Sequence, residues 1–127
     1  MVVMDINERD PLTEKIIACA YKVHSEIGPG FPERIYHNAL KLIIKKEEIK
    51  YESEKEFQVY FDSVKVGIFR CDLFIEEKVI IEIKAVSGRM PILFEHQLLS
   101  YLKASGIKVG LLINFGNLSC EVRRLMK

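Results

Sequence analysis

Apolar residues at helical spacing predict three helices along the chain. The first is expected over residues 11–27, with Asp10 as its N-cap and Gly28 at its end. The second is expected over residues 32–46 and the third over residues 92–105. The apolar stripe of the second helix is expected to consist of Ile35, Ala39, Leu42 and Ile43.

Alternation of apolar and polar residues predicts strands between and after these helices. The expected strands cover residues 56–61, 64–70, 71–75, 79–85, 107–115 and 118–125. The first four follow one another closely and predict a meander, and the last is expected at the edge of the sheet. Mixed pairing is expected where the third helix crosses over to residues 107–115. The pattern therefore predicts an α/β fold with a central mixed β-sheet and flanking helices.

Glu82 and Lys84 interrupt the most apolar of these strands. The run from Val79 to Val86 is typical of a strand that is covered on both faces. A period of two residues places both charged side chains on the same face. A buried carboxylate must be paired, protonated or bound to a metal, because an isolated one is strongly disfavoured away from water. A structural salt bridge is the alternative to a functional site.

Asp72 lies directly opposite Glu82 if residues 76–78 form the link of a hairpin. Ile75 then pairs with Val79, and opposed residues have Cβ atoms roughly 5 Å apart. Two opposed carboxylates repel each other unless a cation lies between them, and their hard oxygens suit Mg²⁺ or Mn²⁺. A two-residue link would move Asp72 to the other face, so the predicted metal site depends on this register.

Two further polar residues are candidates for the same site. Gln97 is expected on the apolar stripe of the third helix, where it either bonds to backbone or points toward Asp72 and Glu82. Glu33 lies in the first turn of the second helix, and Tyr36 shares its side of that helix. The helix dipole by itself favours a carboxylate in that turn.

The order of these residues resembles that of the PD-(D/E)XK nuclease-like superfamily. The motifs that carry the resemblance are Gly30-Phe31-Pro32-Glu33-Arg34-Ile35-Tyr36, Asp72, Glu82-Ile83-Lys84 and Gln97. The first of them also matches the signature of the GxxExxY family within that superfamily. The resemblance extends over about residues 12–125. One departure is Cys71, which stands where the superfamily name implies a proline.

The resemblance implies a restriction-endonuclease-like core in one domain of residues 1–127. It also implies metal-dependent hydrolysis of phosphodiester bonds in nucleic acid by a metal-activated water, with DNA preferred over RNA as the substrate. Asp72 and Glu82 would bind Mg²⁺ (or Mn²⁺) directly, and Glu33 would be the helix carboxylate that completes the metal site. Lys84 would orient the water and stabilise charge on the phosphate, and Gln97 would support the site.

The charge balance leaves other interpretations open. Lys and Arg number 19 against 18 Asp and Glu, so any contact with nucleic acid must come from a local patch. The available local cations are Arg70, Arg89, Lys103 and those of residues 123–127. A second interpretation is therefore a nuclease fold that binds nucleic acid or a protein partner without cleavage. A third is a salt-bridge network of Asp72, Glu82 and Lys84.

Cysteine use and chain length add expectations about compartment and assembly. Cys19, Cys71 and Cys120 are isolated and odd in number, which favours free thiols and the cytoplasm. Charges interrupt every apolar run before roughly 20 residues, so no membrane span is expected. The first ten residues contain no signal-peptide core. The small size favours a homodimer, whose two sites would address two strands.

Overall fold

The computed structural model describes residues 10–127. Its elements in chain order are α1 (Pro11–Ile27), α2 (Glu33–Lys46), β1 (Tyr51–Ser53), β2 (Glu56–Phe61), β3 (Val64–Arg70), β4 (Leu73–Ile75), β5 (Val79–Lys84), α3 (Ile92–Ser105), β6 (Val109–Asn114) and β7 (Glu121–Met126). None of the described helices is long and apolar enough to cross a bilayer. The expectation that no signal-peptide core is present falls on residues 1–9, which lie outside the described residues.

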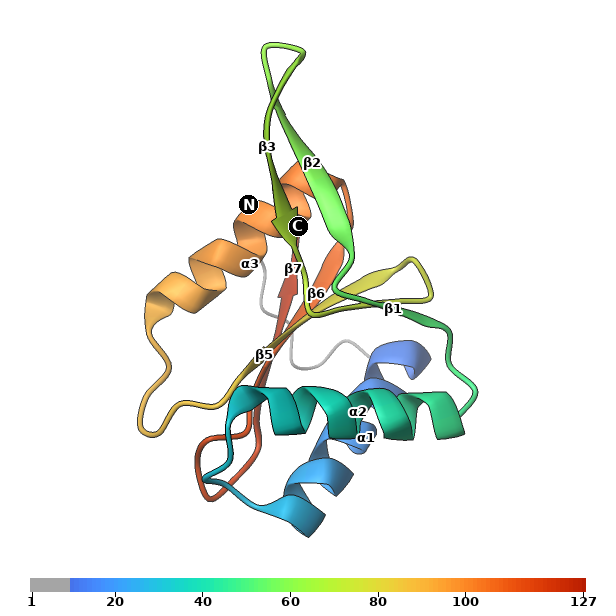
Figure 1. Cartoon of the computed structure of the whole chain (residues 1–127), viewed down its shortest axis with the longest axis vertical. Coiled ribbons are helices and arrows are strands. Elements are labelled where there is room, and N and C mark those ends of the chain that lie inside the picture. Colours follow the sequence, from blue (N-terminus) through green and yellow to red (C-terminus); the bar gives the residue numbers. More distant parts are fainter. Residues whose placement is uncertain (1–9) are drawn as a thin grey trace.

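A five-stranded sheet in the order β1-β4-β5-β6-β7 forms the centre of the described chain. β5 and β6 pair in parallel because α3 connects them, and the other neighbours are antiparallel. α1 and α2 pack on one face of the sheet and α3 packs on the other (Figure 1). This arrangement confirms the predicted α/β fold with a central mixed sheet and flanking helices, and it places β7 at the edge as expected.

The predicted bounds of α1 and α3 are confirmed because their end signals are strong. The Asp10 carboxylate accepts a hydrogen bond from the Leu12 N–H at 3.2 Å, which satisfies one unpaired donor of the first turn of α1. Gly106 ends α3 in the left-handed conformation, with φ 77°, and its N–H donates to the Leu102 carbonyl.

The predicted apolar stripe of α2 is wrong at two positions, because Ile35 is 41% exposed and Leu42 is 57% exposed. The buried apolar residues of α2 are Tyr36, Leu40 and Ile44. They recur every four residues and therefore share one side of the helix. The Tyr36 ring stacks on Phe115 with centroids 4.7 Å apart. The buried face of α2 therefore includes Tyr36, which the predicted apolar stripe left out.

The predicted meander is wrong because β2 and β3 form a separate two-stranded sheet. Figure 1 shows this hairpin projecting away from α1 and α2. The edge position beside β4 is taken by β1, which the alternation did not predict. Three residues are too few to show a period of two. The chain turns out of β1 at Glu54, which has φ 55°.

Candidate metal centre

The β4–β5 hairpin places Asp72 beside Glu82. Leu73 pairs with Ile81 and Ile75 pairs with Val79, so the three-residue link at 76–78 and its predicted register are confirmed. Residues on alternate positions face opposite helices. Ile80 packs on the α3 side and Ile81 on the α1 and α2 side, so Glu82 lies on the α3 side.

The Asp72 and Glu82 carboxylates are fixed by a reciprocal pair of backbone hydrogen bonds. The Asp72 N–H donates to Glu82 Oε2 at 2.8 Å, and the Ile83 N–H donates to Asp72 Oδ2 at 2.7 Å. Each bond occupies one oxygen of its carboxylate. No hydrogen bond within residues 10–127 reaches Asp72 Oδ1 or Glu82 Oε1. The site therefore holds two carboxylates in fixed positions and leaves one oxygen of each available.

Glu82 is unusually basic for a carboxylate. The side chain is only 6% exposed, and burial followed by the negative charge of Asp72 raises its pKa to about 8. The Asp72 N–H and the charge of Lys84 oppose this shift only in part. Near neutral pH the pair therefore retains a proton on Glu82 unless another cation neutralises it.

Lys84 leaves β5 on the same face as Glu82, as the period predicts. Its Nζ lies 4.4 Å from the centroid of the Phe94 ring on α3, a cation–π contact. Within residues 10–127 no ion pair joins Lys84 to Asp72 or Glu82. The predicted alternative, a salt-bridge network of these three residues, is therefore not formed.

Glu33 lies in the first turn of α2, where the charges of Asp72 and Lys84 shift its pKa. Partial burial and the charge of Asp72 raise the pKa of Glu33, while Lys84 and Arg34 lower it. The described residues nevertheless contain no group of three or more His, Cys, Asp or Glu side chains placed to hold a metal ion. The structure thus brings Asp72 and Glu82 together, with Glu33 nearby but outside their immediate pair.

The expectation that Gln97 lies on a buried stripe is wrong, because Gln97 is exposed. Leu98 and Leu102 occupy the buried side of α3. The polar residue that α3 buries is Glu95, whose carboxylate accepts a hydrogen bond from Arg123 Nη1 at 2.9 Å. The role of Gln97 toward the site stays a prediction.

A turn at Glu54 and Lys55, which no sequence pattern predicts, holds the backbone of Asp72. The Glu54 N–H donates to the Asp72 carbonyl at 2.9 Å, and the Cys71 N–H donates to the Lys55 carbonyl at 3.1 Å. The Glu54 carboxylate also accepts a hydrogen bond from Arg34 Nη2 at 2.8 Å. Arg34 follows Glu33 on α2, so this turn connects the two elements that carry candidate acids. No local pattern reports a contact between residues 20 positions apart.

His37, one turn after Glu33, is a second missed neighbour of the site. It is buried, with Nε2 3.3 Å from Ser53 Oγ and Nδ1 3.4 Å from Arg34 Nη1. Burial lowers its pKa, and the negative charge of Asp72 opposes the shift. An imidazole therefore lies within electrostatic range of the carboxylate pair.

A buried asparagine fixes the chain where β5 ends. Asn114 Oδ1 accepts hydrogen bonds from the N–H groups of Val86 and Gly116, and its Nδ2 donates to the Val86 carbonyl. The Phe115 N–H donates to the Lys84 carbonyl at 2.9 Å. A Cβ on Gly116 would lie 2.2 Å from the Val86 oxygen, so only glycine allows this approach. The backbone that carries Lys84 is therefore held from both sides.

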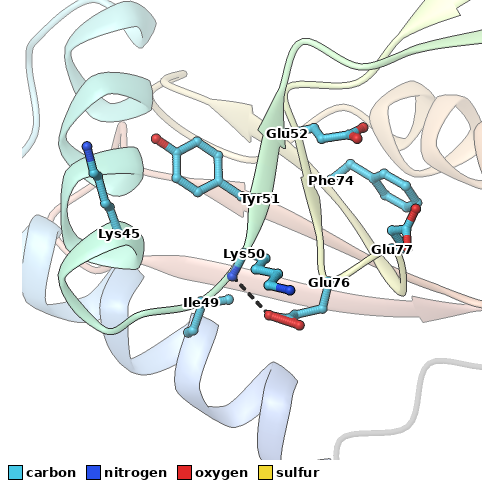
Figure 2. A pocket seen from close by; sticks show the side chains of 8 residues that line it. All are labelled: Lys45, Ile49, Lys50, Tyr51, Glu52, Phe74, Glu76 and Glu77. Carbon is cyan, nitrogen blue, oxygen red and sulfur yellow. Dashed lines mark hydrogen bonds between the residues drawn. The ribbon is translucent and has the colours of Figure 1, made fainter.

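A hollow of about 600 Å³ opens beside the edge strand β1. Figure 2 shows the side chains that line it. Its lining consists of Lys45, Ile49, Lys50, Tyr51, Glu52, Phe74, Glu76 and Glu77. The Lys50 N–H donates to Glu76 Oε1 at 2.9 Å. None of the predicted site residues lines this hollow, so it is separate from the carboxylate pair.

Comparison with known proteins bears on the family and the fold of this chain. A family model described as PD-(D/E)XK nuclease superfamily matches residues 10–125. Among solved structures, the crystal structure of SSO0001 is similar with a TM-score of 0.60 and 22% sequence identity. The similarity covers 74% of this chain and 49% of that one, so this chain spans about half its length and the likeness concerns the fold alone. No curated protein matches the sequence.

Proposed function

This chain belongs to the PD-(D/E)XK nuclease superfamily, and we propose that it is a metal-dependent nuclease, a single domain that hydrolyses phosphodiester bonds in nucleic acid. We assign it within the superfamily to the GxxExxY family, on the stretch from Gly30 to Tyr36. The observation that carries the proposal is the fixed pair of Asp72 and Glu82, which leaves one oxygen of each carboxylate available.

The donor set fits Mg²⁺ or Mn²⁺. Asp72 Oδ1 and Glu82 Oε1 are hard oxygen donors on neighbouring strands, and the raised pKa of Glu82 means that the pair favours an added positive charge. Such an ion, when bound, would polarise the scissile phosphate and lower the pKa of the attacking water. Glu33 would act at longer range through a water that Mg²⁺ retains.

Lys84 and Gln97 would contact the substrate rather than bind the ion. The Lys84 ammonium, held over the Phe94 ring by a fixed backbone, would donate to a phosphate oxygen or to the attacking water. This role needs a positive charge that no carboxylate neutralises, and within residues 10–127 Lys84 forms no ion pair with Asp72 or Glu82. Gln97, exposed on α3, would contact the nucleic-acid backbone.

We propose DNA, rather than RNA, as the substrate, and the cytoplasm as the compartment. All three cysteines are free thiols, with Cys19 and Cys71 buried and Cys120 half-buried, which supports a reducing environment. Affinity for the phosphate backbone would be modest, because Arg70 is paired with Glu56 at 2.7 Å and Arg123 is paired with Glu95. Substrate selection would therefore depend on contacts near the site.

The paired cations also favour the second candidate, a module that binds nucleic acid or a protein without cleavage. A panel of supercoiled plasmid and single-stranded, duplex and branched oligonucleotides separates the two, with Mg²⁺, Mn²⁺ or chelator. The nuclease predicts cleavage that chelator abolishes and that Glu82→Gln lowers by about 100-fold or more. Glu52→Gln, on the exposed strand β1, is the matched control and should cleave normally. Retention of substrate without cleavage in either metal would favour the binding module.

A further inference from the structure

His37 is a buried polar residue of α2 to which the proposed function gives no role. It is 2% exposed and lies one turn after Glu33, so the two side chains leave the same side of the helix. A buried imidazole needs hydrogen-bond partners. The partners of His37 are Arg34 of the same helix and Ser53, the last residue of β1. His37 therefore connects the helix that carries one candidate acid with the edge of the sheet.

The two contacts of His37 fix the position of its ring proton. Nδ1 lies 3.4 Å from Arg34 Nη1, and Nδ1 must accept because a guanidinium can only donate. The ring proton is then on Nε2, which donates to Ser53 Oγ at 3.3 Å. Burial lowers the pKa of His37, which agrees with a neutral ring. The hydrogen bonds therefore run in one direction, from Arg34 through His37 to Ser53.

Ser53 lies beside the backbone of Asp72. Ser53 pairs with Leu73 in the sheet, and Leu73 directly follows Asp72. Glu54, the next residue after Ser53, donates its N–H to the Asp72 carbonyl at 2.9 Å. The Glu54 carboxylate accepts from Arg34 Nη2 at 2.8 Å. Two side chains of α2 thus bond to the short segment that holds Asp72.

The bond of His37 is the more protected of these two connections. The side chains of Arg34 and Glu54 are 58% and 47% exposed, so solvent and salt weaken their ion pair. The other attachment of α2 is apolar, through Leu40 and Ile44 in the core. Apolar contacts are not directional, whereas a hydrogen bond depends on distance and angle. His37 therefore makes the buried, directional contact between α2 and β1.

We propose that His37 is a positioning residue of the metal centre. Its hydrogen bond to Ser53 sets the distance between Glu33 and Asp72. The proposal rests on the proposed function, in which Glu33 acts through a water that Mg²⁺ retains. Mg²⁺ demands near-ideal octahedral geometry, so a small displacement of α2 would weaken that contact. Loss of the His37 bond would therefore weaken metal binding without removing a ligand.

Titration of Mg²⁺ into the full chain at pH 9 tests this proposal without a substrate. That pH is above the pKa of Glu82, about 8, so a change in affinity does not reflect a proton on that carboxylate. His37→Leu should weaken Mg²⁺ binding about 10-fold, the lower end for residues that support metal ligands. His37→Gln should restore most of the affinity, because its amide can donate to Ser53 Oγ. Ser53→Ala, at an exposed position, removes the same bond and keeps the test decisive if His37→Leu fails to fold.

His24 on α1 provides the matched control. It is also buried, at 7% exposed, and its Nε2 lies 2.7 Å from the Asn117 carbonyl oxygen. His24→Leu should lower the melting temperature as His37→Leu does, but it should bind Mg²⁺ as the wild type does. An equal loss of affinity in the two variants would overturn the proposal, because general loosening of the fold would then explain the loss.

A double-mutant cycle identifies the residue through which His37 acts. Glu33→Gln alone should weaken Mg²⁺ binding, and the addition of His37→Leu should weaken it no further. Losses that add in full would overturn the proposal, and so would an unchanged affinity in Glu33→Gln.

The same titrations distinguish failure of this proposal from failure of the metal centre. If the wild type binds Mg²⁺ and both His37→Leu and Ser53→Ala bind it equally well, the role of His37 is wrong and the metal centre stands. A wild type that binds no Mg²⁺ would overturn both.

Discussion

The Asp72 N–H donates a 2.8 Å hydrogen bond to Glu82 Oε2, so the backbone of one acid holds the side chain of the other. The Ile83 N–H returns the bond to Asp72 Oδ2 at 2.7 Å. Carboxylates that repel each other are held together here by backbone donors rather than by lysine or arginine. Their repulsion helps to raise the pKa of Glu82, and a divalent ion that replaced the proton would relieve the repulsion instead.

The first prediction concerns the stability of the metal-free protein. The pKa of Glu82 is about 8 when folded and 4.5 as the reference for an unfolded chain, so the folded state binds the extra proton between these values. Stability is therefore greatest below about pH 4.5, as far as this group is concerned, and falls as the pH rises to 8. The loss amounts to about 4 kcal/mol.

Urea denaturation at pH 5 and pH 8 in chelator measures this effect. Glu82→Gln keeps an oxygen acceptor for the Asp72 N–H but cannot ionise, so its stability should change much less between the two pH values. Glu52→Gln should retain the wild-type slope. If the free energy of unfolding changes equally with pH in the wild type and in Glu82→Gln, the ionisation of Glu82 does not destabilise the fold.

The second prediction concerns metal binding. An ion that binds the folded state alone raises the melting temperature, by the equivalent of about 2.7 kcal/mol at 100 times its dissociation constant. The increase with Mg²⁺ or Mn²⁺ should be larger at pH 8 than at pH 6, because the ion must displace the proton from Glu82. Differential scanning fluorimetry with and without chelator detects it. Asp72→Asn should remove the increase, and an unchanged melting temperature for the wild type would argue against the metal centre.

Much of this site could be predicted from the sequence because its register is local. The three residues of the link at 76–78 fix the pairing of β4 with β5, and that pairing sets Asp72 beside Glu82. The turn at Glu54 was missed because β1 has three residues and because the bond from Arg34 spans 20 positions. Such contacts depend on how α2 packs on the sheet, and the spacing of apolar residues along the chain does not predict that packing.

The assignment of faces on helices was less reliable than the assignment of their ends. The apolar residues around Gln97 predict that it lies on the buried stripe, yet α3 buries Glu95 and pairs it with Arg123 on β7. A buried acid is predictable only once its partner is known, and this partner lies 28 residues away. Tyr36 shows the converse, since its ring belongs to the core while its hydroxyl donates to the Gly28 carbonyl.

The third prediction separates the charge of Lys84 from its packing. Lys84→Met keeps an unbranched apolar chain against Phe94 and removes the ammonium. Because the charge of Lys84 lowers the pKa of Glu82, its removal should raise that pKa further and weaken Mg²⁺ binding at pH 7 more than at pH 9. Isothermal titration calorimetry at the two pH values measures the difference. An equal change at both pH values would mean that the charge of Lys84 does not act on the site through the pKa of Glu82.

The last prediction tests whether the fixed end of β5 is needed to present Lys84. Gly116→Ala would place a Cβ 2.2 Å from the Val86 oxygen, so the two loops must separate. We expect a loss of about 1–3 kcal/mol in the free energy of unfolding, as for other overpacked sites. Gly67→Ala, where an added Cβ meets nothing within 4 Å, is the control and should lie within about 0.5 kcal/mol of wild type. Asn114 bonds to both loops, and the Phe115 N–H donates to the Lys84 carbonyl. Gly116→Ala should therefore also disturb the backbone at Lys84. Amide hydrogen exchange should therefore be faster at Phe115 and Val86 in Gly116→Ala, and unchanged protection there would mean that the loops accept the methyl group without moving Lys84.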